Sequence, residues 1–221
     1  MRYIVTGGYG FIGSAVIRQL IASGHDVFNL DKKTYAANPS AIAGLDVQNV
    51  HACITDRPAV EALFKAARPD AVIHLAAETH VDRSIDGPSA FMKTNVDGTF
   101  CLLEAALDWW QNNGRDEAFR FVHVSTDEVF GDLARAGQRT FGLPTRVTNC
   151  TNNYGPWQNA EKLIPTVIRK AVLGAPIPIY GDGQNIRDWL YVEDHARGLI
   201  EACGAAPGST LLFGARAERT N

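Results

Sequence analysis

The sequence predicts an α/β fold, a doubly wound parallel sheet with a smaller, incomplete C-terminal domain. Apolar runs of strand length alternate with amphipathic stretches of helix length, which is typical of parallel strands joined by crossover helices. The strand candidates are almost continuously apolar, as at residues 72–75 and 121–124, and helices usually cover such strands on both faces. A glycine-rich turn follows the first strand, where sheets of this kind bind their ligands.

The strands and helices alternate in order as far as residue 125. In the first helix Ile12, Val16 and Leu20 recur every four residues and form an apolar stripe that faces the sheet. Gly24 ends this helix, and Pro69 follows the end of the second. The strands are expected at residues 2–6, 26–30, 49–54, 71–75, 120–125 and 146–150, and the helices at residues 11–23, 57–67 and about 89–110.

This alternation breaks between residues 126 and 145. A crossover helix is due before the strand at 146–150, but the stretch at 134–140 is too short to cover a sheet face. We therefore expect that a segment of the natural protein is missing between Leu133 and Ala134, which leaves one face of the sheet uncovered. The stop at Asn221 is expected to be a similar loss.

The pattern changes beyond residue 150. A loop with the sequence NNYGPWQN is expected first, then a helix at 160–174, a short strand at 177–180 and a helix at 192–203. We expect residues 1–150 to form the dinucleotide-binding domain and residues 151–221 to form part of a substrate-binding region.

Composition and charge exclude several classes of protein. The net charge of −3 argues against nucleic-acid binding, and charged, polar or glycine residues interrupt every apolar run short of a membrane span. We expect a cytoplasmic protein without a metal site. The four cysteines lie far apart in the sequence and are expected to be buried thiols.

The glycine-rich turn has the sequence TGGYGFIG, with Gly7, Gly10 and Gly13 three residues apart. Glycines allow a tight turn, a close approach of backbone N–H groups to a pyrophosphate, and close packing of helix on strand. The motif alone is weak, but here it lies between a predicted strand and helix, and Asp31 follows at the end of the second strand. These residues predict a Rossmann-like, NAD-binding fold.

Asp31 is expected to bind the adenine ribose hydroxyls and to repel a 2′-phosphate, although an ordinary turn carboxylate is the alternative. The site is therefore expected to prefer NAD over NADP, and the positive charges of Lys32 and Lys33 are expected to weaken this preference. Asp56 either approaches the adenine or caps the helix at 57–67, and both roles are compatible.

Two further stretches follow strand ends. Ala76 and Ala77 allow the cofactor to pass close to the backbone, and Thr79 offers a hydroxyl near the nicotinamide, whereas the polar residues at 80–83 are more simply interpreted as a satisfied cluster. Asp127 and Glu128 come just after the buried strand at 120–125. In a closed crevice, repulsion and burial raise the pKa of one of two adjacent carboxyl groups, which leaves an acid beside a base.

Five motifs occur in an order that carries a family resemblance: TGGYGFIGS, LAAETHVDRSI, STDEVFG, TNCTNNYGP and IRDWLYVEDHARG. With them the chain resembles the dTDP-glucose 4,6-dehydratases of the extended short-chain dehydrogenase/reductase family over nearly its whole length. The Thr-Asp-Glu sequence separates it from nucleotide-sugar 4-epimerases of the same fold, which lack this acid–base pair. A 4-epimerase or decarboxylase, or a non-catalytic NAD-binding module, remains an alternative.

The resemblance implies oxidation of dTDP-glucose at C4, loss of water across C5 and C6, and return of hydride to C6. It implies that Asp127 is the general acid at C6, Glu128 the base at C5, and Thr126 a partner of the C4 oxygen. The motifs and the resemblance together place at NAD Gly7, Gly10, Phe11, Ile12, Gly13, Asp31, Lys32, Thr34, Ile54, Asp56, Leu75, Ala76, Ala77, Thr79, Thr94, Ser125 and Asn153. They place at the nucleotide-sugar Thr79, Thr126, Asn152, Lys162, Leu163, Pro178, Ile179, Tyr180 and Arg187.

The chain departs from the family in one respect. The family's Tyr-x-x-x-Lys pair, which removes the C4 hydroxyl proton and holds the ribose, has no counterpart, because no Tyr in this sequence is followed by Lys four residues later. The gap coincides with the missing crossover helix. The resemblance also implies a homodimer for the complete protein, formed through the absent helix and the one near residues 89–110. Asp188, Trp189 and Glu193 are expected to stabilise the fold and not to face substrate.

Overall fold

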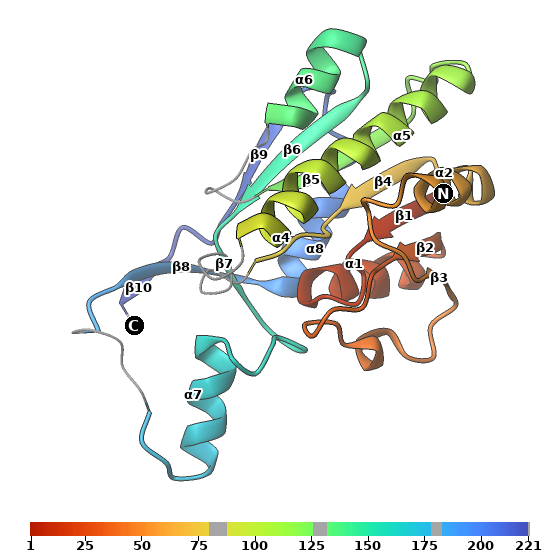
Figure 1. Ribbon diagram of the computed structural model, residues 1–221. Helices are drawn as coiled ribbons and strands as arrows, with labels where there is room; N and C mark the ends of the chain where they lie inside the picture. The colour runs from red at the N-terminus through yellow and green to blue at the C-terminus, as the bar shows by residue number, and fades with distance from the viewer. Residues whose placement is uncertain (80–87, 126–131, 178–182, 221) are drawn as a thin grey trace.

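The structure is a computed structural model that describes residues 1–79, 88–125, 132–177 and 183–220. A parallel sheet of seven strands in the order β3-β2-β1-β4-β5-β6-β9 forms its centre, and a small sheet in the order β10-β8-β7 lies beside it (Figure 1). The strands are β1 (Arg2–Thr6), β2 (Asp26–Leu30), β3 (Val47–Val50), β4 (Ala71–His74), β5 (Arg120–Ser125), β6 (Thr145–Cys150), β7 (Asn152–Tyr154), β8 (Ile186–Tyr191), β9 (Thr210–Phe213) and β10 (Glu218–Thr220).

Helices cover both faces of the large sheet, so the predicted doubly wound class is confirmed. One apolar core lies under α1 (Phe11–Ala22) and α8 (Val192–Ala202), and the other lies under α2 (Arg57–Ala67), α5 (Thr99–Asn112) and α6 (Asp132–Phe141). A short helix α4 (Pro88–Met92) and a π-helix (Lys93–Gly98) precede α5, and a 3₁₀ turn (Pro39–Ile42) follows β2. The order of strands reverses between β1 and β4, which is where an open parallel sheet forms its ligand crevice.

The stretch between β5 and β6 contains a helix, so the expected uncovered sheet face is wrong. Helix α6 is only 10 residues long, but it buries Ala134 completely, and Leu143 just beyond its end is also buried. The Thr145 hydroxyl donates to the Ala134 carbonyl at 2.8 Å and ties the start of the helix to β6. A short helix is sufficient here because α5 packs against it and completes the cover.

Several element boundaries also differ from the predicted ones. The third strand ends at Val50, before the predicted end at 54, and the helix expected at about 89–110 is divided by the π-helix. The loop expected at 152–159 begins with strand β7, and strands β8, β9 and β10 were not predicted. Strands β7, β9 and β10 have only three or four residues, and β8 mixes charged with apolar residues, so none of them shows a clear periodicity. The predicted strand at 177–180 falls almost wholly outside the described residues.

The segment beyond residue 150 crosses between the two sheets. β7, β8 and β10 form the small sheet, whereas α8 packs on α1 and β9 pairs with β6 at the edge of the large sheet. Helix α7 (Leu163–Val172) has no buried residue and lies away from the large sheet in Figure 1. The division into domains at residue 150 stays a prediction.

Three other expectations concern the cysteine thiols, membrane spans and the role of Asp188. Cys203 is buried, but Cys53, Cys101 and Cys150 are only partly so, which corrects the expectation that all four thiols are buried. The described ranges include no helix with the length and apolar character that crossing a membrane requires. Asp188 accepts hydrogen bonds from the backbone N–H groups of Arg216 and Ala217, which confirms its expected role in the fold.

Buried histidines make the stability of the fold sensitive to acid. Burial lowers the pKa of His123 to about 4 and that of His195 to about 4. An unfolded histidine takes up a proton below pH ~6.5, whereas the folded one stays neutral until about pH 4, so stability is full above ~6.5 and falls as the pH drops through this window. Each histidine is expected to lower the free energy of unfolding by about 3 kcal/mol as the pH falls from ~6.5 to about 4.

Urea unfolding at pH 7.5 and pH 4.5 tests this expectation. In a His195→Gln variant the difference between the two free energies of unfolding is expected to be about 2.5 kcal/mol smaller than in the wild type. His51, which is exposed, supplies the control substitution His51→Gln. An equal pH dependence in wild type and His195→Gln would contradict the prediction.

Candidate active site

A cavity of about 650 Å³ opens at the carboxyl end of the large sheet. The turn after β1, the ends of β2, β4, β5 and β6, and the loop before α7 form its walls. Its lining residues are Gly7, Gly10, Phe11, Ile12, Gly13, Leu30, Asp31, Lys32, Thr34, Tyr35, Ala36, Ala37, Asn38, Ala52, Ile54, Leu75, Ala76, Ala77, Thr79, Thr94, Val124, Ser125, Cys150, Trp157, Gln158, Asn159, Ala160 and Lys162.

The glycines of the turn are required by backbone contacts. Gly7 has a φ of +74°, and a Cβ there would lie 2.9 Å from the Ala76 backbone. A Cβ on Gly13 would lie 2.2 Å from the Gly7 carbonyl oxygen. No side chain caps the first turn of α1, which begins after Gly10, so its N–H groups and partial positive charge face the cavity. The turn therefore fits a pyrophosphate.

Substituting Gly13 with Ala is expected to lower stability by about 3 kcal/mol, because the new methyl group meets backbone that cannot move aside. The same displacement widens the turn and weakens NAD binding. Gly137→Ala is the matched control, because a Cβ on this helix glycine meets nothing within 4 Å and raises stability by roughly 0.5–1 kcal/mol. Urea unfolding and a calorimetric NAD titration measure both effects, and equal behaviour of the two variants would contradict the assignment.

Asp31 closes one end of the cavity. Its carboxylate accepts the Tyr9 N–H at 3.0 Å on one oxygen and the Lys33 N–H at 2.7 Å on the other, and the residue is only 9% exposed. Two backbone hydrogen bonds fix the carboxylate in place, yet each oxygen has another lone pair that can accept a hydroxyl proton. The geometry fits recognition of a ribose diol.

A buried polar chain supports the cavity wall beside the glycine turn. The Thr6 hydroxyl oxygen accepts the N–H groups of Leu75 and Ala76 at 3.2 and 3.1 Å. Its own proton is then directed to His74 Nδ1 at 2.7 Å, so that His74 Nε2 carries the ring proton and donates to Thr99 Oγ1 at 3.0 Å. Burial, together with the nearby His123, lowers the pKa of His74 well below its usual value. A neutral imidazole thus holds the backbone that lines the cavity.

Most residues predicted to contact NAD do line this cavity, and two do not. Asp56 is the N-cap of α2 and accepts the Ala59 N–H at 3.2 Å. Asn153 Oδ1 accepts a hydrogen bond from His195 Nδ1 at 2.9 Å, and Asn153 Nδ2 donates to the Thr151 carbonyl at 3.0 Å, so this side chain is used within the fold. Their contact with NAD stays a prediction.

Of the residues predicted at the substrate, Thr79 and Lys162 line the cavity. Asn152 is exposed on β7, Arg187 is exposed on β8, and Leu163 begins α7, and none of the three is among the lining residues. Thr126, Asp127, Glu128, Pro178, Ile179 and Tyr180 lie outside the described residues.

The prediction missed part of the lining. Tyr35 and its neighbours to Asn38, and the loop from Trp157 to Ala160, complete the cavity. These residues lie in irregular segments, so no periodicity marks them. The only signal in the sequence was the glycine–proline pair within NNYGPWQN, which marks a loop near a strand end.

Comparison with known proteins identifies the family. A family model for GDP-mannose 4,6 dehydratase matches residues 4–139, and one for the NAD dependent epimerase/dehydratase family matches residues 132–210. A dTDP-glucose 4,6-dehydratase of Escherichia coli strain K12 is 46% identical over 267 residues, which cover 100% of this chain and 74% of that protein. The chain belongs to the dTDP-glucose 4,6-dehydratase family.

Solved structures agree with this placement. DesIV, a dTDP-glucose 4,6-dehydratase of Streptomyces venezuelae with NAD bound, is 39% identical to this chain with a TM-score of 0.88. The match covers 100% of this chain and 78% of DesIV. A UDP-glucose 4-epimerase of Thermotoga maritima has the same TM-score at 26% identity, covering 100% of this chain and 79% of that one. The backbone fold therefore does not separate dehydratases from epimerases, and the residues of the site must do so.

The family alignment also bears on the interrupted pattern after β5. The E. coli dehydratase contributes 267 residues against 221 here, so roughly 45 of its residues have no counterpart inside this chain. Residues present in that dTDP-glucose 4,6-dehydratase are thus absent from this sequence. Their position between Leu133 and Ala134 stays a prediction.

Proposed function

We propose that this chain binds NAD in the cavity and dehydrates dTDP-glucose to dTDP-4-keto-6-deoxyglucose. The observation that carries the proposal is the end of β5. Ser125 is buried and lines the cavity, and the next three residues of the sequence are Thr126, Asp127 and Glu128. An acid–base pair at this position supports dehydration, whereas epimerisation does not require one.

The cavity fits the dinucleotide on three independent features. The glycine turn is so tight that a Cβ on Gly7 or Gly13 would clash with backbone, the uncapped first turn of α1 supplies N–H donors, and the Asp31 carboxylate lines the cavity where ribose hydroxyls can reach it. The small residues Ala76 and Ala77 line the path towards Ser125. When bound, NAD supplies the acceptor and donor of hydride.

Asp127 is assigned as the acid that protonates the departing C6 hydroxyl, and Glu128 as the base that removes the C5 proton. Thr126 would hold the C4 oxygen, and a carbonyl at C4 makes the C5 proton acidic enough for a carboxylate to remove. Lys162, which lines the cavity beside the loop before α7, would contact the diphosphate of the substrate. Arg187, Asn152 and residues 178–180 are assigned to the same ligand by family resemblance.

A second function has one observation in its favour. Without the family's Tyr and Lys, no side chain is assigned to remove the C4 hydroxyl proton, and a general base contributes about 10²–10⁴ to a rate. A chain that binds NAD and turns over very slowly, or not at all, is the alternative. The alternative and the dehydratase share the cofactor site and differ in chemistry alone.

Incubation of the purified chain with NAD and dTDP-glucose tests the proposal. A 4-keto-6-deoxy sugar detected by NMR spectroscopy supports the dehydratase. A galactose product would support an epimerase, and NAD binding with no product over days would support the non-catalytic module. Either of the last two results would overturn the proposed reaction.

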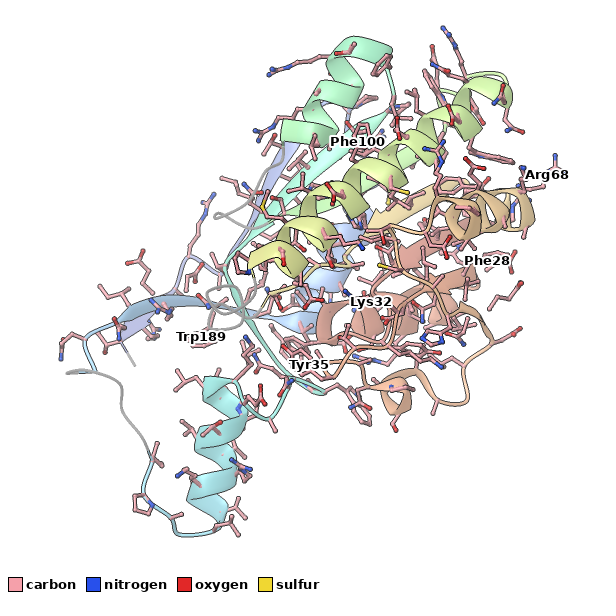
Figure 2. All side chains as sticks on the ribbon, viewed as in Figure 1. Phe28, Lys32, Tyr35, Arg68, Phe100 and Trp189 are labelled. Carbon is pink, nitrogen blue, oxygen red and sulfur yellow. The ribbon has the colours of Figure 1, made fainter. Side chains whose placement is uncertain are left out.

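We also propose that the complete protein forms a homodimer, and that the layer of α4, α5 and α6 contributes to its interface. Met92, Phe100 and Phe141 are 53%, 50% and 53% exposed, which is unusual for large apolar side chains on one helix layer. Phe100 is labelled in Figure 2. Phe100→Lys is expected to shift the molecular mass measured by light scattering from dimer to monomer. Exposed Val172 on α7 supplies the control Val172→Lys, and a monomeric wild type would contradict the proposal. A cytoplasmic location and the domain division at residue 150 remain predictions.

A further inference from the structure

One ion pair lies at the edge of the cofactor cavity and has no role in the chemistry above. Lys32 Nζ lies 2.7 Å from Glu78 Oε1 and 3.1 Å from Thr94 Oγ1. The lysine side chain is 33% exposed and the glutamate 26% exposed, so the pair is largely shielded from water. Lys32 directly follows Asp31 and is labelled in Figure 2. The pair therefore directs the ammonium of Lys32 to Glu78 and Thr94.

The partner side of the pair is held rigidly. The Glu78 N–H donates to Asn95 Oδ1 at 2.8 Å, and Asn95 Nδ2 donates back to the Glu78 carbonyl at 2.9 Å. Thr94 and Asn95 both belong to the π-helix that precedes α5, and Thr94 is buried. A π-turn is rare and is often kept where it places functional side chains. Here it supplies both the clamp on Glu78 and the second ligand of Lys32.

This arrangement bears on which dinucleotide the cavity accepts. Of the described residues that line the cavity, only Lys32 and Lys162 carry a positive charge, and Lys32 is the one adjacent to Asp31. The neighbouring Lys33 is not among the lining residues, and its ammonium lies 5.4 Å from the centre of the Tyr9 ring. A 2′-phosphate beside Asp31 would need a cation to offset the carboxylate, and Lys32, the lining lysine next to Asp31 in the sequence, is already paired.

We propose that Glu78 is a specificity-determining residue, which by pairing with Lys32 makes the site select NAD against NADP. This inference rests on the proposed function, because it assumes that the dinucleotide binds in this cavity. Selectivity is a difference between two affinities, and it can come from withholding a favourable contact from the wrong ligand. Asp31 repels the 2′-phosphate, and Glu78 keeps Lys32 from compensating for that repulsion.

The test compares dissociation constants for NAD and NADP by isothermal titration calorimetry. Glu78→Gln keeps the shape of the side chain and removes its charge, so Lys32 becomes available to a 2′-phosphate. The ratio Kd(NADP)/Kd(NAD) is expected to fall about tenfold, as one additional charge contact of modest strength would give. In a Lys32→Met background the same Glu78→Gln change is expected to leave the ratio within twofold.

Glu193→Gln is the matched control. Glu193 is also 26% exposed and pairs with Arg18, so its substitution removes the same charge from a similar ion pair between α1 and α8. This control is expected to leave the ratio unchanged. A ratio in Glu78→Gln that stays within twofold of the wild type, or falls equally without Lys32, would overturn the inference while NAD binding is intact. A wild type that binds neither dinucleotide would overturn the proposed function, and this inference with it.

Discussion

Asp127→Asn and Glu128→Gln are each expected to lower the rate of dehydration by about 10²–10⁴-fold, because each removes one proton-transfer group from the elimination step. Asn cannot protonate the C6 hydroxyl as it departs, and Gln cannot take the C5 proton. Neither side chain is needed for the earlier oxidation at C4. We therefore expect reduced nicotinamide to accumulate during the first turnover of these variants, while the affinity for NAD stays unchanged.

Rapid mixing with dTDP-glucose measures both quantities, since the absorbance of reduced nicotinamide reports oxidation and NMR spectroscopy reports the product. Glu117→Gln is the control, because Glu117 is exposed in the segment before β5. Full-rate product formation by either variant would show that its assigned role is wrong. A bound nucleotide-sugar whose hexose ring lies far from these carboxylates would reject both assignments together.

Restoring the internal segment is expected to raise kcat by a factor similar to the one that the Asp127 and Glu128 substitutions remove. A chimera carries the roughly 45 additional residues of the E. coli dehydratase between Leu133 and Ala134, the position predicted from the sequence. If the segment brings the family's Tyr and Lys to the cavity, the C4 hydroxyl proton gains a base, and kcat is expected to rise by about 10²–10⁴-fold. Steady-state kinetics with dTDP-glucose measure the change.

The control for this chimera carries Phe in place of the Tyr of the inserted Tyr-x-x-x-Lys sequence. It supplies the same helix cover to the sheet, and so separates the effect of the base from that of improved packing. Equal kcat values for the two chimeras would show that the Tyr is not the base. A chimera no faster than the present chain would contradict the predicted position of the segment.

Local features of the sequence predicted much of the fold and of the cofactor site. Strand β5 was predicted at its observed bounds because a largely apolar run of this length is typical of a buried strand, and α2 was predicted because Asp56 caps it and its apolar spacing is regular. The glycine turn and Asp31 were found because close backbone approach imposes residue types at fixed spacing. The short strands β7, β9 and β10 could not be predicted, since their residues become strands only through pairing with distant partners.

The same distinction holds for single side chains. Asp31 was predicted at the ribose from its place after the second strand, but the pairing of Lys32 with Glu78 joins residues 46 positions apart and depends on how β2 and β4 lie beside β1. Asn153 was expected at NAD, yet its amide is bonded to His195 of a later helix. Such contacts depend on the angle between elements, which a linear pattern does not contain.

By itself the sequence determined the α/β class, the dinucleotide turn, the family and the acidic pair after β5, because steric limits and periodicity act within a few residues of one another. Only the tertiary structure decided that α6 is long enough to cover the sheet, that β9 forms the edge strand beside β6, and that Glu78 pairs with the ammonium of Lys32. These outcomes depend on which surfaces meet after the chain has folded, and long-range packing is what brings them together.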